Sequence, residues 1–413
     1  MKHLSFVFFI MLAAMFSCSS QQQAEKDIVK SNFGFASEQL IFAMTEIDKA
    51  IAEESPESKK SREVRSWGEL VNPRTINKER KLELVASRDW TSGFYPGELW
   101  YMYEYTKDKK WEELARKYTD PLECEKTNGN THDMGFKIYC SFGNGNRLTK
   151  DNRYKDIMLE SAYTLITRYN PTVGCIRSWD HNSDKWQYPV IIDNMMNLEL
   201  LFWASRESGN PVFYDIAVNH ARTTTKNHFR NDYSTYHVID YDTITGEVMN
   251  KHTHQGYAHE SAWSRGQAWG LYGYTMCYRE TKLPEFLEQA KRIANYIFTH
   301  PNLPEDLIPY WDFNAPAIPN EPRDVSAATI TASALYELSL YDKENATKYI
   351  EQAETILKNL SENYLAKKGG DRGFLLLHST GSKPANSEVD VPLVYADYYF
   401  LEALLRKQSI ATK

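Results

Sequence analysis

Several residue types and motifs that mark common protein classes are scarce or missing in this sequence. Only five of its 413 residues are cysteine, and their spacing matches no metal-binding motif. The net charge of −7 provides no basic excess, so we expect no nucleic-acid partner. A glycine-rich phosphate loop, a serine nucleophile elbow and a reactive-cysteine signature are also absent. Aromatic residues are abundant instead, with 27 tyrosines and 10 tryptophans, which suits a glycan site as well as a filled core.

The N-terminal segment has the pattern of an export signal. Residues 1–17 combine Lys2 with an apolar run that is too short to span a bilayer, which predicts a signal peptide. Cys18 lies at a site resembling a bacterial lipoprotein cleavage site, so we expect it to be lipidated; plain secretion is the alternative. Residues 18–32 then form a flexible tether ahead of one large domain over 33–413. The predicted location is the periplasm or, through the anchor, the outer membrane. At either location the sequence allows the cysteines to form disulfides or to remain free buried thiols.

Helical periodicity dominates the chain after the tether. Short connections and adjacent pairs favour a closed ring of helical hairpins over a bundle or a solenoid, although no sequence repeat accompanies them. The twelve expected helices span 34–53, 93–106, 109–118, 132–146, 152–169, 193–207, 211–228, 262–281, 284–299, 325–342, 344–362 and 391–406.

Strand signals are few. The segments Tyr236–Tyr241 and Glu247–Lys251, joined by a turn that contains Gly246, predict one β-hairpin. Gly373–His378 is a further short extended piece, and Pro301–Pro322 is expected to form a long ordered loop over one end of the ring. The expected fold class is therefore all-α with one small hairpin.

The stretch 251–274 concentrates polar and aromatic residues around a loop that leads into a helix. Arg265 and Trp269 are four residues apart and share one helix face, where a guanidinium and an indole can approach the same ligand. A second stripe consists of Gly266, Gly270 and Gly273. Each glycine costs about 0.8–1 kcal/mol relative to alanine in a helix interior, so we expect close approach of a backbone or a ligand. The alternative is a core helix with one surface arginine.

Two aspartates are candidates for acid–base chemistry. Asp133 lies among polar residues at an expected helix start, and Asp193 follows an apolar run at another. Either residue could be only a helix N-cap, a position that aspartate favours. If both face one pocket, their pKa values are pushed apart, which leaves one protonated as a general acid near neutral pH.

Trp90 and Phe94, in a glycine-containing segment before a helix, predict either a stacking wall for a sugar ring or a capped turn. Trp179, in an irregular segment, is a similar candidate. A separate cluster of potential zinc ligands consists of His252, His254, His259 and Glu260. Its spacing matches no strong zinc signature, so we interpret these residues as part of a binding loop and expect neither a metal nor another cofactor.

The chain resembles glycoside hydrolase family 88, the unsaturated glucuronyl hydrolases, in five stretches that occur in the family's order. These are DWTSGFYPGELW from Asp89, HDMGF from His132, DNMMNLELLFWAS from Asp193, THQGYAHESAWSRGQAWGLYG from Thr253 and RDVSAATITASALYEL from Arg323. The resemblance implies an (α/α)6 barrel, which agrees with the number of expected helices.

The implied activity is hydration of a C4=C5 double bond rather than attack at the anomeric carbon. The substrate would be an unsaturated glucuronic acid at the non-reducing end of a glycosaminoglycan oligosaccharide produced by a lyase. By motif match, Asp193 protonates C4 and activates water, and Asp133 is the second essential carboxylate. The rivals are an unsaturated rhamnogalacturonyl hydrolase and a non-catalytic glycan-binding lipoprotein.

The resemblance also assigns substrate-binding positions. The matching residues are Trp90, Phe94, His132, Trp179, Thr253, Gln255, Arg265 and Trp269. Some family members carry a sulfate-binding motif, which corresponds here to Ser379, Ser382 and Lys383 with one spacer residue missing. Where the family has a glycine two residues before the matching threonine, this chain has Lys251.

Overall fold

The computed structural model describes residues 28–64 and 68–411. The predicted signal peptide, Cys18 and most of the predicted tether lie outside the described residues. The tether prediction is wrong for residues 28–32, because these residues already belong to a helix over 28–52. Within the described ranges, no helix is both long enough and apolar enough to cross a membrane.

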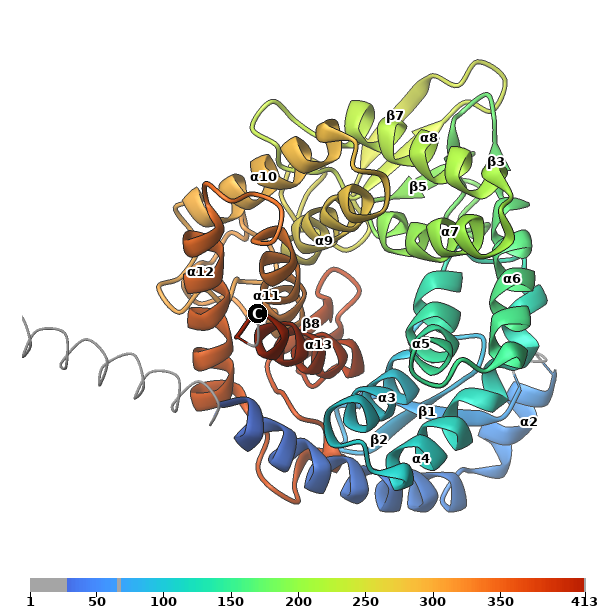
Figure 1. Cartoon of the computed structure of the whole chain (residues 1–413), viewed down its shortest axis with the longest axis vertical. Helices are drawn as coiled ribbons and strands as arrows, with labels where there is room; N and C mark the ends of the chain where they lie inside the picture. Colours follow the sequence, from blue (N-terminus) through green and yellow to red (C-terminus); the bar gives the residue numbers. More distant parts are fainter. Residues whose placement is uncertain (1–27, 65–67, 412–413) are drawn as a thin grey trace, which may run out of the picture.

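Six helical segments form the inner ring of the barrel (Figure 1). They are α3 (Phe94–Thr106), η2 (Gly135–Gly143) with its continuation α5 (Asn144–Thr149), α7 (Asn194–Ser208), α9 (Ser264–Thr281), α11 (Val325–Leu338) and α13 (Val394–Ala411). Each segment packs against the next, and α13 packs against α3, so the ring closes. The expected all-α (α/α)6 barrel is confirmed.

The outer ring consists of the helix over 28–52, α4 (Lys109–Thr119), α6 (Asn152–Ile166), α8 (Pro211–His228), α10 (Pro284–Thr299) and α12 (Ala346–Asn359). These helices are amphipathic; α4, for example, buries Trp111, Ala115 and Tyr118 and exposes its charged side. The inner helix α11, by contrast, consists mainly of apolar and small residues, and every one of its residues is buried. Three helical pieces were not predicted: α2 (Pro56–Val64), η1 (Asp120–Thr127) and η4 (Asp371–Gly373). The helix predicted over 344–362 ends in η3 (Leu360–Tyr364), two residues later than expected.

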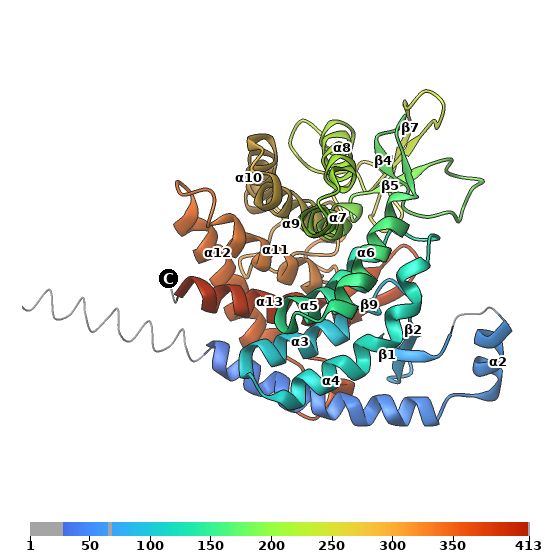
Figure 2. The ribbon, with the colours of Figure 1, turned by 45° about the vertical axis from the view of Figure 1, so that its right-hand side comes forward.

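The predicted hairpin is confirmed as β6 (Val238–Tyr241) paired with β7 (Val248–His252), and β5 (Pro189–Ile191) extends it. Three further two-stranded sheets occur in the described chain, so the expectation of one hairpin is wrong. They pair β1 (Leu70–Ile76) with β2 (Leu82–Ala86), β3 (Tyr169–Asn170) with β4 (Cys175–Ile176), and β8 (Ser379–Ser382) with β9 (Ser387–Val391). The extended piece predicted over 373–378 is also displaced, because β8 begins at Ser379. Figure 2 shows the strands gathered at one end of the helical ring.

The loop over Pro301–Pro322 contains neither a helix nor a named strand, as predicted. The glycine stripe on α9 has two different explanations. A Cβ on Gly273 would lie 2.5 Å from the Cβ of Met195 in α7, and one on Gly266 would lie 2.9 Å from the Trp263 ring. The predicted close approach of a backbone is therefore confirmed at Gly273, where the added atom would also lie 3.4 Å from the Met195 backbone. At Gly266 the close neighbour is a side chain instead, and Gly270 has only ordinary contacts. The cysteines at 124, 140, 175 and 277 are free thiols, which excludes disulfides among them in this structure.

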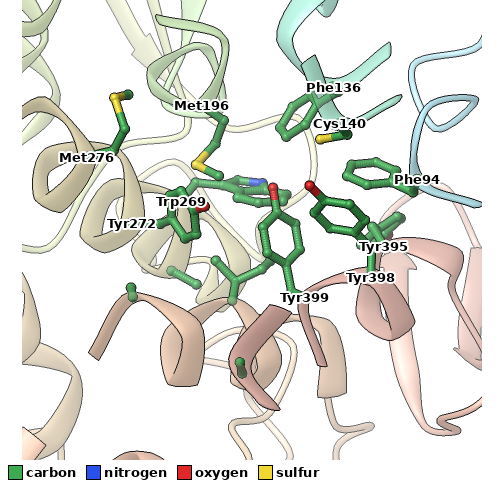
Figure 3. Close-up of a cluster of buried hydrophobic side chains, with 14 of the residues drawn as sticks. Phe94, Phe136, Cys140, Met196, Trp269, Tyr272, Met276, Tyr395, Tyr398 and Tyr399 are labelled. Carbon is green, nitrogen blue, oxygen red and sulfur yellow. The ribbon is translucent and has the colours of Figure 1, made fainter. Parts of the chain in front are cut away.

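An aromatic layer crosses the centre of the barrel (Figure 3). Its rings are those of Phe94, Phe136, Trp269, Tyr395, Tyr398 and Tyr399. The ring centres of Phe136 and Trp269 are 5.1 Å apart, and those of Trp269 and Tyr399 are 5.5 Å apart. This layer separates the two ends of the barrel.

Candidate active site

A cavity of about 470 Å³ lies at the end of the barrel where the inner helices begin. Trp90 lies before α3, Asp133 before η2 and Asp193 directly before α7, whereas Arg265 and Tyr395 occupy the first turns of α9 and α13. Residues of the β8–β9 hairpin complete the wall. Because helix N-termini carry partial positive charge, this arrangement favours an anionic ligand.

Asp193 lies at the N-cap position of α7, but its side chain makes no capping hydrogen bond. The residue is 8% exposed, and its Oδ2 has no hydrogen-bond partner within the described chain. The interpretation of Asp193 as only a helix cap is therefore wrong. A buried carboxyl oxygen without a partner is unfavourable in a structural residue and is explained by a ligand that enters the cavity.

The surroundings of Asp193 raise the pKa of its carboxyl to about 7, mainly through burial. The charge of Arg265 opposes this shift, and the negative charge of Asp133 adds to it. A carboxyl with this pKa can donate a proton at neutral pH and can take one back as a carboxylate. Asp193 thus has the properties of a general acid and base.

Asp133 is held by its neighbours at the start of η2. Thr131 Oγ1 donates to its Oδ2 at 2.7 Å, and His132 Nε2 lies 3.2 Å from its Oδ1. Burial lowers the pKa of His132, so the imidazole is neutral near pH 7. The helical segment begins only at Gly135, which means that Asp133 is not its N-cap. Two neutral groups therefore orient this carboxylate toward the cavity that it lines.

Arg265 is 1% exposed, so the alternative of a surface arginine is wrong. Its Nη1 donates to Asp324 Oδ2 at 2.7 Å and to the Thr380 carbonyl at 2.6 Å, and its Nη2 donates to the Gly381 carbonyl at 2.6 Å. Nε has no acceptor among the described residues. The protein thus fixes the guanidinium and leaves the edge formed by Nε and the second Nη2 hydrogen for a ligand, which is a geometry that suits a carboxylate.

Eight of the predicted site residues line this cavity. They are Trp90, His132, Asp133, Trp179, Asp193, Gln255, Arg265 and Ser382. Trp179 lies between His181 and His254, with its ring centre 5.1 Å and 5.7 Å from theirs, and all three side chains line the same wall. A flat aromatic side chain in this position can stack against a sugar.

Five predicted residues lie outside the lining. Phe94 and Trp269 belong to the aromatic layer beneath it, where Phe94 supports Trp90 at 5.8 Å. The indole Nε1 of Trp269 is buried without a partner in the described chain, and it affects the pKa of Asp193 from below the cavity. These two side chains support the site rather than form its surface.

The other three are engaged elsewhere. Thr253 Oγ1 accepts a hydrogen bond from the Gly256 N–H at 2.8 Å. Ser379 is fully buried, and Lys383 forms an ion pair with Glu321, which also accepts the indole N–H of Trp311. A sulfate group would have to compete with Glu321 for Lys383.

His237 was missed in the sequence, although it lies next to Asp193. Its Nε2 is 3.7 Å from Asp193 Oδ2, and its Nδ1 accepts the backbone N–H groups of His254 and Gln255 at 3.1 Å each. Burial lowers the pKa of His237 well below its usual value, so the neutral ring carries its proton on Nε2 and points it toward Asp193. In the sequence it was visible only as a residue within the expected strand Tyr236–Tyr241.

Tyr395, Arg74 and Glu388 also line the cavity without a sequence signal. The Tyr395 hydroxyl is buried and has no partner in the described residues. Arg74 forms a two-point ion pair with Glu388, with distances of 2.6 and 2.9 Å. In the cluster of potential zinc ligands, two histidines accept ordinary hydrogen bonds from the protein. His252 Nδ1 accepts from the Trp186 indole, and His259 Nδ1 accepts from the Thr253 N–H. No group of three potential metal ligands was found in the described part of the chain.

The fold and its paired carboxylates lead to a glycoside hydrolase family. The model of Glycosyl Hydrolase Family 88 matches residues 67–402, and the chain belongs to this family. It is 55% identical to an unsaturated glucuronyl hydrolase of Formosa agariphila over 80% of this chain and 82% of that protein. It is 34% identical to an unsaturated chondroitin disaccharide hydrolase of Streptococcus agalactiae over 82% and 85% of the two chains.

Solved structures give the same relationship. A crystal structure described as an unsaturated glucuronyl hydrolase specific for heparin superposes with a TM-score of 0.85 at 47% identity, covering 94% of this chain and 98% of that one. The unsaturated glucuronyl hydrolase of Bacillus sp. GL1, described as responsible for glycosaminoglycan degradation, superposes with a TM-score of 0.81 at 30% identity, covering 93% and 98%.

Proposed function

We propose that this protein is an unsaturated glucuronyl hydrolase that acts on glycosaminoglycan oligosaccharides produced by a lyase. The observation that carries the proposal is Asp193, a buried carboxyl that caps no helix, has a pKa of about 7 and shares its cavity with Asp133 and Arg265. The open edge of Arg265 suits the carboxylate of the uronic acid. Membership of the family supports the same activity.

The chemistry follows from these positions. Asp193 donates a proton to C4 of the C4=C5 bond, and the resulting positive charge is shared by C5 and the ring oxygen. Asp133, as a nearby carboxylate, stabilises this charge. Water adds to C5 and gives its proton to the Asp193 carboxylate, which restores the acid. The hemiketal formed at C5 opens to a ketone and leaves a hemiacetal at C1. This hemiacetal collapses to an aldehyde, which breaks the bond from C1 to the attached sugar and releases that sugar with a free hydroxyl.

His237 has a supporting part in this scheme. Two backbone N–H groups fix its Nδ1 as an acceptor, so its Nε2–H faces Asp193 in one tautomer. The neutral imidazole lies beside the carboxyl without adding a charge that would lower its pKa. Trp179 and Gln255 line the wall where the neighbouring sugar can lie.

Ultraviolet absorbance of the unsaturated ring tests this proposal directly. The purified protein is incubated with unsaturated disaccharides from heparin, chondroitin and hyaluronan, and with an unsaturated rhamnogalacturonyl disaccharide. Absorbance should disappear with the glucuronyl substrates. Consumption of only the rhamnogalacturonyl substrate would assign the rival activity, and binding without loss of absorbance would identify a glycan-binding protein.

We also propose that the protein is exported and held at the membrane by a lipid on Cys18. The support is the basic and apolar pattern of residues 1–17, which precedes this cysteine. The anchor is tested by measuring how much of the protein is in the membrane fraction and how much is in the soluble fraction of cells that express the full chain. Cys18→Ala should move the protein to the soluble exported fraction; equal distribution of both proteins would contradict lipidation.

A further inference from the structure

A buried asparagine on α7 connects the two elements that position the aspartates. Asn197 lies four residues after Asp193, on the same face of the helix, and is fully buried. It does not line the candidate active site, and the proposed reaction does not use it. The other aspartate, Asp133, precedes η2, which is the neighbour of α7 in the inner ring. A buried amide costs free energy unless its oxygen and nitrogen find partners, so its contacts indicate its role.

The amide oxygen of Asn197 binds the first turn of η2. Oδ1 accepts the backbone N–H of Phe136 at 3.1 Å. The first N–H groups of a helix have no acceptor within the helix, so this side chain supplies one from α7. Because the N–H of Phe136 can only donate, Oδ1 must face it, and the amide nitrogen Nδ2 must face the other way.

Two glycines allow the neighbouring helices to lie this close to η2. A Cβ on Gly135 would lie 2.6 Å from Asn197 Cα and 2.7 Å from its Oδ1, so a larger residue would push η2 away from α7. At the start of α3, a Cβ on Gly93 would lie 2.1 Å from the Phe136 carbonyl oxygen and 2.4 Å from that of Lys137. The first turn of η2 is therefore held between α3 and α7, and its position fixes the segment that precedes it.

The amide nitrogen of Asn197 faces the histidine next to Asp133. Nδ2 lies 3.5 Å from His132 Nδ1, and His132 Nε2 lies 3.2 Å from Asp133 Oδ1. Burial lowers the pKa of His132, so the ring is neutral near pH 7 and has one N–H. Since Nδ2 can only donate, both contacts are favourable only if Nδ1 accepts and Nε2 donates to Asp133. Asn194 Oδ1 also lies near the ring but makes no hydrogen bond within the described chain.

We propose that Asn197 is a positioning residue that holds Asp133 in place relative to Asp193. It acts through the first turn of η2 and through His132, whose Nε2–H tautomer it selects. The inference rests on the proposed function, in which one carboxyl protonates the sugar ring and the other stabilises the charge that develops. A displacement of about 1 Å between reacting groups can cost about 10²-fold in rate, so a side chain that never touches the substrate can still control turnover.

The tautomer of His132 gives a test that does not depend on activity. The ¹⁵N spectrum of full-length protein with labelled histidines reports which ring nitrogen carries the hydrogen, and His132→Gln assigns the signals. We expect the hydrogen on Nε2 in the parent protein. In Asn197→Asp a carboxylate oxygen replaces the donor, so Nδ1 should gain a hydrogen. A parent protein with the hydrogen on Nδ1, or an unchanged Nδ1 in Asn197→Asp, would overturn the proposal.

The kinetic test uses Asn197→Leu, which is similar in size but has no polar group. With the glucuronyl disaccharide that the parent consumes fastest, kcat should fall at least about tenfold. KM should change less than about threefold, because the cavity wall and Arg265 remain in place. The matched control is Asn32→Leu. Asn32 is also buried, and it connects the helix over 28–52 to η3 through a 2.9 Å hydrogen bond to Ser361 Oγ, away from the cavity. This control should lower the unfolding temperature and leave kcat unchanged.

Unchanged kcat in a folded Asn197→Leu protein would overturn the proposal, and so would an equal loss of kcat in Asn32→Leu. A rise in KM as large as the fall in kcat would also overturn it, because that result indicates lost substrate binding. If Asn197→Leu does not fold, Asn197→Asp takes its place with the same expected fall in kcat. A parent protein that leaves every glucuronyl disaccharide intact would refute the proposed function instead, and the tautomer measurement would still decide whether Asn197 sets the state of His132.

Discussion

Replacing Asp193 with asparagine should strongly reduce turnover and at the same time stabilise the protein at alkaline pH. The pKa of this carboxyl is raised from 3.8 to about 7, so the folded protein holds the proton more tightly than the unfolded chain does. Folding stability must therefore fall as the pH rises from about 4 to about 7. At about 1.4 kcal/mol for each pKa unit, full ionisation of Asp193 costs roughly 4 kcal/mol.

Asparagine has nearly the same shape and does not ionise. Asp193→Asn should therefore be more stable than the parent by up to about 4 kcal/mol at pH 8 and nearly equal to it at pH 4. The turnover rate should fall by about 10²–10⁴-fold, because an amide cannot act as a general acid. The unsaturated disaccharide should still bind. Thermal unfolding at both pH values and the ultraviolet assay measure these quantities.

Asp215→Asn is the matched control, because it removes an exposed carboxylate from α8. It should change neither turnover nor the pH dependence of unfolding. Substantial turnover by Asp193→Asn would remove Asp193 from the mechanism. A stability difference that is the same at pH 4 and pH 8 would show that its ionisation is not penalised in the folded protein. Asp133→Asn should also lose activity, and a silent result there would mean that one carboxylate suffices.

Three further predictions concern the same site. The turnover rate should decline as the pH rises above about 7, because Asp193 loses its proton there, and a pH–rate profile that stays flat to pH 9 would contradict this. Arg265→Lys keeps the positive charge but loses the planar guanidinium that can bind a carboxylate at two points. The apparent KM should therefore rise about tenfold or more, with a smaller change in kcat. Unchanged kinetics would mean that Arg265 does not bind the substrate. Activity should survive exhaustive chelation. A loss of activity that added zinc restores would instead indicate a metal site at the cluster of His252, His254, His259 and Glu260.

The barrel could be predicted from the sequence because helices have a local signature. Apolar periodicity marks an outer helix such as α4, and a long run of apolar and small residues marks an inner helix such as α11. The small sheets lack such a signature. β3 and β4 have two residues each, and β1 contains Pro73, so their pairing depends on partners that the barrel brings together.

The candidate active site also has features that the sequence predicted and features that it left open. The residue types and their places at helix starts marked Asp133, Asp193 and Arg265, because helix boundaries can be read locally. The sequence left open whether Asp193 was a cap or an acid. The missing cap hydrogen bond argues against a cap, and burial with the unpaired Oδ2 supports the proposed acid; all of these are properties of the packed barrel.

Only the tertiary structure decided which side chains surround those residues. Arg265 is oriented by Asp324 and by the carbonyl of Thr380, which lie 59 and 115 residues away in the chain. His237 reaches Asp193 from the start of another element, and Phe94 lies below the cavity although its neighbour Trp90 lines it. Side chains that are distant in sequence meet only when the ring closes, so local patterns indicate which residues can perform chemistry and long-range packing determines which of them do.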